Sequence, residues 1–134
     1  MKEYRNELGQ YHRVDGPALE DDVGNKYWYQ HGQRHRVDGH AIEHADGTRE
    51  WLQNDQHHRV DGPAIELSDG YKAWYHTGKF HRVDGPAVEY TNGSKYWFLY
   101  GRNITAEVES WLNEQQISLP LNESIRVLFM LRFG

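Results

Sequence analysis

Short segments rich in β-branched and aromatic residues recur through residues 12–103, and polar turn-forming dipeptides separate them. Three of these dipeptides are Asp46-Gly47, Asp69-Gly70 and Asn92-Gly93. Such pairs are preferred in two-residue hairpin turns, and the frequent glycines argue against helices. The pattern therefore predicts a series of β-hairpins.

The turn positions also predict which residues face each other across a hairpin. With Asp46 and Gly47 as the turn, Ile42 would face Trp51. The same register gives an aliphatic residue facing a tryptophan in the other hairpins: Leu19 with Trp28, Ile65 with Trp74 and Val88 with Trp97. Because alternate residues of a strand point to opposite faces, these pairs should line one face of a sheet.

The hairpins belong to a tandem repeat with a period of 23 residues. HRVDGPALE begins at His12, HRVDGHAIE at His35, HRVDGPAIE at His58 and HRVDGPAVE at His81. We therefore expect a β-hairpin array over residues 1–103, with a partial repeat at 1–11 and full repeats at 12–34, 35–57, 58–80 and 81–103. One strand from the partial repeat and two from each full repeat predict a single-sheet meander, or solenoid, of about nine strands.

The pattern changes at Ile104, which occupies the position of the repeated histidine. The next segment, TAEVESWLNEQQ, places Val108, Trp111 and Leu112 at helical spacing behind Thr105 as an N-cap. This predicts a short amphipathic helix. A second helix is expected over about residues 122–132, with its apolar side chains on one side: Ile125, Leu128, Phe129 and Leu131.

We expect residues 104–134 to form a C-terminal α-helical cap. The terminal repeat of a solenoid exposes a sheet edge and apolar surface, and an atypical element usually covers them. The segment VLFMLRF offers more apolar surface than a helix of this length needs, so a homodimer through the C-terminal helices is a further expectation. The predicted fold class is mainly β, a tandem hairpin repeat with a helical cap.

Composition and charge narrow the class of protein. The chain has 134 residues, 20 Asp and Glu against 15 Lys and Arg, and no cysteine. The net charge of -5 argues against nucleic acid or an anionic membrane as a partner. No apolar run approaches the roughly 20 residues that span a bilayer, and the first ten residues lack the apolar core of a secretory signal. We therefore expect a cytoplasmic protein.

Trp74, Tyr75, Gly78, Lys79 and Gly93 form a pattern that resembles the MORN-type repeat, whose units also have 23 residues and begin with an aromatic residue. The glycine-rich segment of that family is replaced here by the HRVDGPA block. The chain therefore looks like the HRxDGPA variety of repeat found in bacteria and bacteriophages. This resemblance implies a role in interaction and, for a phage-encoded protein, a location in the host cytoplasm.

Nine histidines raise the question of a metal site, but their spacing argues against one. Equivalent residues of neighbouring repeats should lie about 10 Å apart, so the repeated histidines cannot share a zinc ion in pairs. A mixed site from Asp55, His57 and His58 is the alternative to solvated loop residues. We expect no metal and no cofactor. Because no G-x-S-x-G, P-loop or H-E-x-x-H motif occurs, we also expect no enzyme.

The HRVDG block allows two interpretations of its arginines. Each arginine has an aspartate two residues later, which favours an internal ion pair that fixes the connection between hairpins. The alternative is a ligand ladder that binds phosphate or carboxylate groups. The arginines concerned are Arg13, Arg36, Arg59 and Arg82.

The sequence of the second repeat departs most from those of the other repeats. A specific binding site can arise at positions where the repeats differ. The distinctive residues of the second repeat are our candidate binding residues, with drift at tolerant surface positions as the alternative: His40, His44, Leu52, Asp55 and His57. The function we expect is a non-enzymatic protein-interaction module, which the resemblance extends to a bacteriophage protein that binds or inhibits a host defence factor. The alternative is a small-molecule or nucleotide binder, or sponge, with aromatic and Arg/His slots between repeats.

Overall fold

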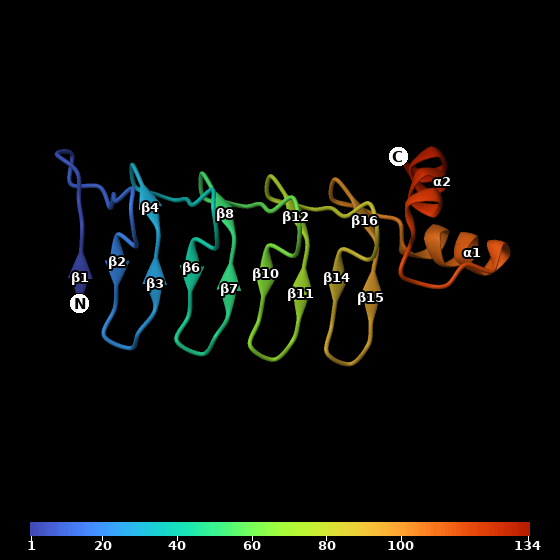
Figure 1. The fold of residues 1–134 in the computed structure, drawn as a ribbon, viewed down its shortest axis with the longest axis horizontal. Helices are drawn as coiled ribbons and strands as arrows, with labels where there is room; N and C mark the ends of the chain where they lie inside the picture. Colours follow the sequence, from blue (N-terminus) through green and yellow to red (C-terminus); the bar gives the residue numbers. More distant parts are fainter.

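The computed structural model describes residues 1–134 and shows one row of β-hairpins followed by two helices (Figure 1). The hairpins stand side by side along the long axis of the molecule. The N-terminus lies at one end of the row, and both helices lie at the other (Figure 1). The predicted hairpin array with two C-terminal helices is confirmed.

Nine short strands form a single antiparallel sheet. Their order in the sheet is their order along the chain, and the strands missing from this order form separate small hairpins. This is the nine-strand meander that the repeat predicts. Its strands are β1 (Lys2–Glu3), β2 (Leu19–Glu20), β3 (Lys26–Tyr27), β6 (Ile42–Glu43), β7 (Arg49–Glu50), β10 (Ile65–Glu66), β11 (Lys72–Ala73), β14 (Val88–Glu89) and β15 (Lys95–Tyr96).

Each full repeat also contains a second, smaller hairpin that the sequence analysis did not predict. The central residues of its two-residue turn both have positive φ, as at His31 (50°) and Gly32 (80°). This is the geometry of a type I′ turn, which explains the repeated glycine. The second hairpins are β4 (Tyr29–Gln30) with β5 (Gln33–Arg34), β8 (Leu52–Gln53) with β9 (Gln56–His57), β12 (Tyr75–His76) with β13 (Lys79–Phe80), and β16 (Phe98–Leu99) with β17 (Arg102–Asn103).

The predicted register of the main hairpins is wrong by one residue. Ile42 pairs with Glu50 rather than with Trp51. The cause is a three-residue loop, which the backbone hydrogen bond from His44 N to Thr48 O closes around a glycine with a φ of 94°. The corresponding pairs in the other hairpins are Leu19 with Tyr27, Ile65 with Ala73 and Val88 with Tyr96.

This register gives one face of the main sheet a strict alternation of charge. Every acidic residue on that face pairs with a basic residue on each side, so like charges are never direct neighbours. In sheet order the positions are Lys2, Glu20, Lys26, Glu43, Arg49, Glu66, Lys72, Glu89 and Lys95. We call this surface the charged face.

The tryptophans connect neighbouring repeats through the backbone. Trp28 N donates to Ala41 O at 2.7 Å, and the same bond recurs from Trp51 to Ala64 and from Trp74 to Ala87. The accepting alanines are fully buried.

The two helices pack on the last hairpin. They are α1 (Thr105–Gln115) and α2 (Glu123–Phe133). Asn122 caps α2, because its side chain accepts a hydrogen bond from Ile125 N. Neither helix is long and apolar enough to cross a membrane.

Two details of the helix prediction are wrong. Thr105 is the first helical residue rather than the N-cap, because its hydroxyl accepts from Trp97 N instead of from the helix. Leu128 and Leu131 are 50% and 79% exposed. Phe133 is buried in their place, since it follows Phe129 by one helical turn and so lies on the same side of α2.

The main hydrophobic core lies between the last hairpin and the helices. Its buried residues are Trp97, Leu99, Ile104, Val108, Leu121, Phe129 and Phe133. The ring centroids of Trp97 and Phe129 lie 5.5 Å apart. A second, smaller core of Ala41, Ile42 and Leu52 lies inside the second repeat.

We expect Phe129→Ala to destabilise the protein by about 3–5 kcal/mol, because it empties the centre of the main core. Chemical denaturation followed by tryptophan fluorescence measures this free energy of unfolding. Leu131→Ala is the matched control in the same helix, and its effect should stay within about 0.5 kcal/mol. Equal losses in the two variants would contradict the assignment of this core.

Candidate functional site

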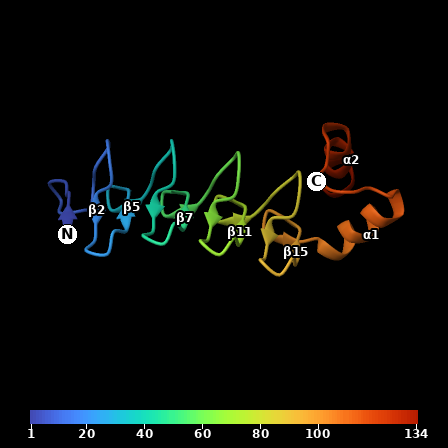
Figure 2. The same ribbon diagram turned by 60° about the horizontal axis from the view of Figure 1, so that its bottom comes forward.

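The segments that join one repeat to the next protrude from the array, and we call them connectors. They comprise residues 12–17, 35–40, 58–63 and 81–86. Figure 2 shows them as pointed loops on one side of the row, with α2 at the end of the same side.

An arginine holds each connector in place. Arg59 Nε donates to Asp61 Oδ1 at 3.1 Å, and Nη1 donates to Pro63 O at 3.0 Å. Its guanidinium carbon lies 3.8 Å from the ring centroid of Trp51 in the preceding repeat. A Cβ at Gly62 would approach that carbon to 2.8 Å, which explains the glycine.

The other connectors repeat this arrangement. The arginine Nε to aspartate Oδ1 distance is 3.2 Å for Arg13 and Asp15, 3.0 Å for Arg36 and Asp38, and 2.8 Å for Arg82 and Asp84. Tyr4 replaces tryptophan beneath Arg13, at 4.1 Å. The predicted internal ion pair is therefore confirmed, and these arginines already have partners within the protein.

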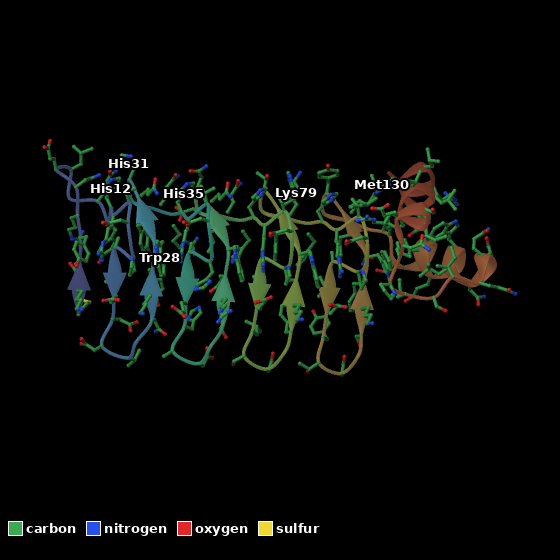
Figure 3. All side chains as sticks on the ribbon, viewed as in Figure 1. His12, Trp28, His31, His35, Lys79 and Met130 are labelled. Atoms are coloured by element: carbon green, nitrogen blue, oxygen red, sulfur yellow. The ribbon has the colours of Figure 1, made fainter.

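The first histidine of each connector accepts a hydrogen bond from the turn of the following second hairpin. His58 Nδ1 accepts from Thr77 N at 3.0 Å. The same bond occurs from His31 N to His12, from Asn54 N to His35 and from Tyr100 N to His81. An accepting Nδ1 requires the neutral ring with its proton on Nε2. Figure 3 shows His12, His31 and His35 along one long edge of the row.

The tips of the first three connectors are exposed and carry a valine and an aspartate each. Val14, Val37 and Val60 are 76%, 74% and 85% exposed. The side chains of Asp15, Asp38 and Asp61 are 86–87% exposed. The fold gains little from these valines, because most of their apolar surface stays in water.

The fourth connector tip differs because the helices cover it. Val83 is half-buried and packs against the main core. Asp84 Oδ2 lies 3.8 Å from Arg126 Nη1 of α2, and the exposure of its side chain falls to 43%. The same tip sequence is thus free in three repeats and occupied by a helix in the fourth.

Open grooves separate neighbouring connectors. The groove between the third and fourth has a volume of about 610 Å³, and Arg59, Trp74, His81 and Arg82 help to line it. The groove between the second and third has about 650 Å³ and is lined in part by Arg36 and Trp51.

Two of the residues predicted from the second repeat meet through a third residue that the sequence analysis missed. Glu50 accepts from His44 Nε2 at 2.7 Å and from His57 Nε2 at 2.8 Å. The hydrogen bond from His57 is the main cause that lowers the pKa of Glu50 to about 2, and His44 adds to it. Equivalent positions hold Tyr27, Ala73 and Tyr96, so a comparison of that column would have revealed Glu50.

The other predicted residues of the second repeat serve contacts within the array. Leu52 is fully buried and therefore cannot touch a partner, which corrects its place among the binding residues. Asp55 has a φ of 65°, as its replacement of glycine predicts, and its side chain accepts from Arg34 N at 2.8 Å. His40 lies edge-on to Trp51 with ring centroids 5.4 Å apart, and burial lowers its pKa.

The mixed metal site considered from Asp55, His57 and His58 is not assembled. These residues contact Arg34, Glu50 and Thr77 instead. No group of three or more His, Asp or Glu side chains is arranged to hold a metal ion.

No family model, curated protein or solved structure matches this chain. The resemblance to MORN-type repeats therefore stays a prediction that rests on the aromatic, glycine and HRVDGPA positions of the sequence.

We expect the protein to lose stability as the pH falls below about 6.5, the ordinary pKa of histidine. Burial lowers the pKa of His58 and His81, and the charge of His76 lowers them further. The unfolded chain then binds more protons than the folded one, so the free energy of unfolding decreases with falling pH. Urea denaturation at pH 7.5 and 5.5 measures the difference.

The matched variant for this test is His58→Asn with His81→Asn. Asparagine retains an acceptor near the position of Nδ1 but does not titrate in this range. The difference in stability between the two pH values should therefore become smaller. If the variant and the parent lose the same stability between the two pH values, groups other than His58 and His81 cause the acid sensitivity.

We expect Glu50→Gln to destabilise the fold by about 1–3 kcal/mol at pH 7, because an amide cannot accept from both imidazoles. The contribution of this carboxylate should be complete above about pH 4.5 and disappear as the pH falls towards 2. Urea denaturation at pH 7 and pH 3 tests both statements. Glu89→Gln on the charged face is the control and should change stability by less than about 0.5 kcal/mol.

Proposed function

We propose that this protein is a non-enzymatic interaction module that binds a protein partner along the first three connector tips. The observation that carries the proposal is the contrast between these tips and the fourth. A helix covers Val83 and pairs with Asp84, while Val60 is 85% exposed and the side chain of Asp61 is 86% exposed. The protein itself thus provides an example of a protein segment bound at a connector tip.

The geometry of the row supports a partner that is extended rather than compact. The tips occur once per repeat on one side of the array (Figure 2). Each contributes an aliphatic side chain beside a negative charge, which together provide contact area and orientation. The charged face is less suited, because each of its interior charges already has an opposite charge on both neighbouring strands.

The resemblance to bacterial and phage repeats suggests where the partner comes from. On that basis we propose a bacterial host protein as the partner of a phage-encoded module, with inhibition of the host factor as the result. This part of the proposal rests on the resemblance alone.

A second candidate function is supported by the grooves between connectors. Their volumes of about 610 and 650 Å³ and their tryptophan and arginine linings would accommodate a nucleotide or another small anion. The arginines, however, already donate to aspartate and to a backbone carbonyl, which favours the protein partner.

The test is affinity capture from cells that naturally contain the protein, followed by reconstitution with the purified partner. We expect Val37→Lys with Val60→Lys to reduce binding roughly tenfold or more, because both valines would lie inside the contact. The control is Lys26→Ser with Lys72→Ser on the charged face, which should bind as the parent does.

Two results would contradict this proposal. The first is the lack of any stoichiometric protein partner, and the second is a partner whose binding the valine variant does not weaken.

The small-molecule function has its own test, which is mass spectrometry of the small molecules released when the protein is denatured. That function requires a nucleotide or metabolite at a ratio near one per groove.

A further inference from the structure

We infer that the segment bound along the connector tips is a basic amphipathic α-helix with a heptad pattern, in which an aliphatic residue and a neighbouring Arg or Lys recur every seven residues. The inference rests on the proposed function and specifies the partner. Its evidence is the spacing of the tips, their charge and the way α2 contacts the fourth tip.

The spacing of the tips matches the heptad of a helix. Two strands of the main sheet separate equivalent residues of neighbouring repeats, which corresponds to about 9.6 Å. Seven residues of an α-helix rise about 10.5 Å, and the eighth side chain returns to within about 20° of the first. A helix inclined by about 24° to the row would match all three tips: Val14, Val37 and Val60.

An extended strand does not fit the same row. Three residues of a strand also cover about 10 Å, but side chains separated by three positions point to opposite faces. Only every second tip would then meet a side chain. A polyproline helix repeats every three residues over about 9.3 Å and is therefore the competing conformation that an experiment has to distinguish.

The contact of α2 with the fourth tip favours the helix over polyproline. Arg126 approaches Asp84, and the neighbouring hollow is formed by Val83 with Val127 and Met130 of α2. A basic side chain of α2 thus lies near the aspartate of this tip, and two apolar side chains of α2 line a hollow beside its valine. At the first three tips the valine and the aspartate stay exposed, and no helix of this chain covers them.

The charge of the tips determines which charge the partner should carry. The carboxylates of Asp15, Asp38 and Asp61 each keep one oxygen on an arginine Nε, but their side chains are 86–87% exposed. The net charge of the chain is also -5. A basic partner is therefore attracted both at long range and at each tip.

The experiment uses the full chain and synthetic peptides of three heptads, about 21 residues. The first peptide carries Leu and Arg at heptad spacing, the second has the same composition in scrambled order, and the third is proline-rich with Arg every third residue. Fluorescence anisotropy at low salt measures their affinities, and circular dichroism measures helix formation on binding. We expect the heptad peptide to bind roughly tenfold tighter than either other peptide and to become helical.

Substitution of the three tip aspartates provides the matched variant. Asp15→Asn, Asp38→Asn and Asp61→Asn together remove the charge but keep an acceptor for each arginine, so the melting temperature should remain nearly unchanged. We expect the heptad peptide to bind roughly 5- to 30-fold more weakly to this variant.

The outcomes separate this inference from the proposed function. If the scrambled or the proline-rich peptide binds as tightly as the heptad peptide, or if the aspartate variant binds it unchanged, the basic helical partner is wrong. The function would still stand in that case, provided that the natural partner is lost from the Val37→Lys, Val60→Lys variant. If the natural partner also binds that variant fully, the connector tips are not the binding surface and both proposals fall.

Discussion

The stacked arginine of the connector is the interaction on which the array depends. In one residue it joins three parts of the chain: the aromatic ring of the preceding repeat, the aspartate two positions later and the backbone carbonyl that precedes the buried alanine. Each of these contacts is modest when the partners are exposed. Here they fix the direction in which the chain leaves one hairpin and enters the next. The repeated arginine, aspartate and glycine of the HRVDG block follow from this geometry.

A thin fold of this kind has few other sources of stability. Only 19 of 134 residues are buried, and the largest cluster of them lies at the helical end. Within the repeats, order comes instead from bonds that recur at every step, such as Trp28 N to Ala41 O and Asn54 N to His35 Nδ1. Stability should then be nearly a sum over neighbouring repeats, as in other one-dimensional arrays. The second repeat fits this view, because its unusual residues bond to one another and to the first repeat: His44 bonds to Glu50, and Asp55 accepts from Arg34.

The sequence was sufficient for the hairpin array, the nine-strand sheet and the two C-terminal helices, because period and turn chemistry are local signals. The register was not, since Asp-Gly suits both a two-residue loop and a three-residue loop with glycine at its end. The second hairpins were missed because their turn pairs, such as His31-Gly32 and Thr77-Gly78, lack the Asn-Gly or Asp-Gly signal of a two-residue turn. The exposure of Val60 could not be inferred either, since a residue repeated in every unit is equally consistent with a packing role.

The contact between Phe129 and Trp97 has a consequence for how the array ends. In the preceding repeats the corresponding tryptophan receives an arginine from the next connector, as Trp74 receives Arg82. That aromatic face is the place where one repeat contacts the next, and the last tryptophan, Trp97, has no further connector to contact it. Phenylalanine occupies this aromatic face with a hydrocarbon ring that offers neither charge nor hydrogen bonds. The helix therefore takes the place of a fifth connector, and it keeps the last tryptophan of the array out of water.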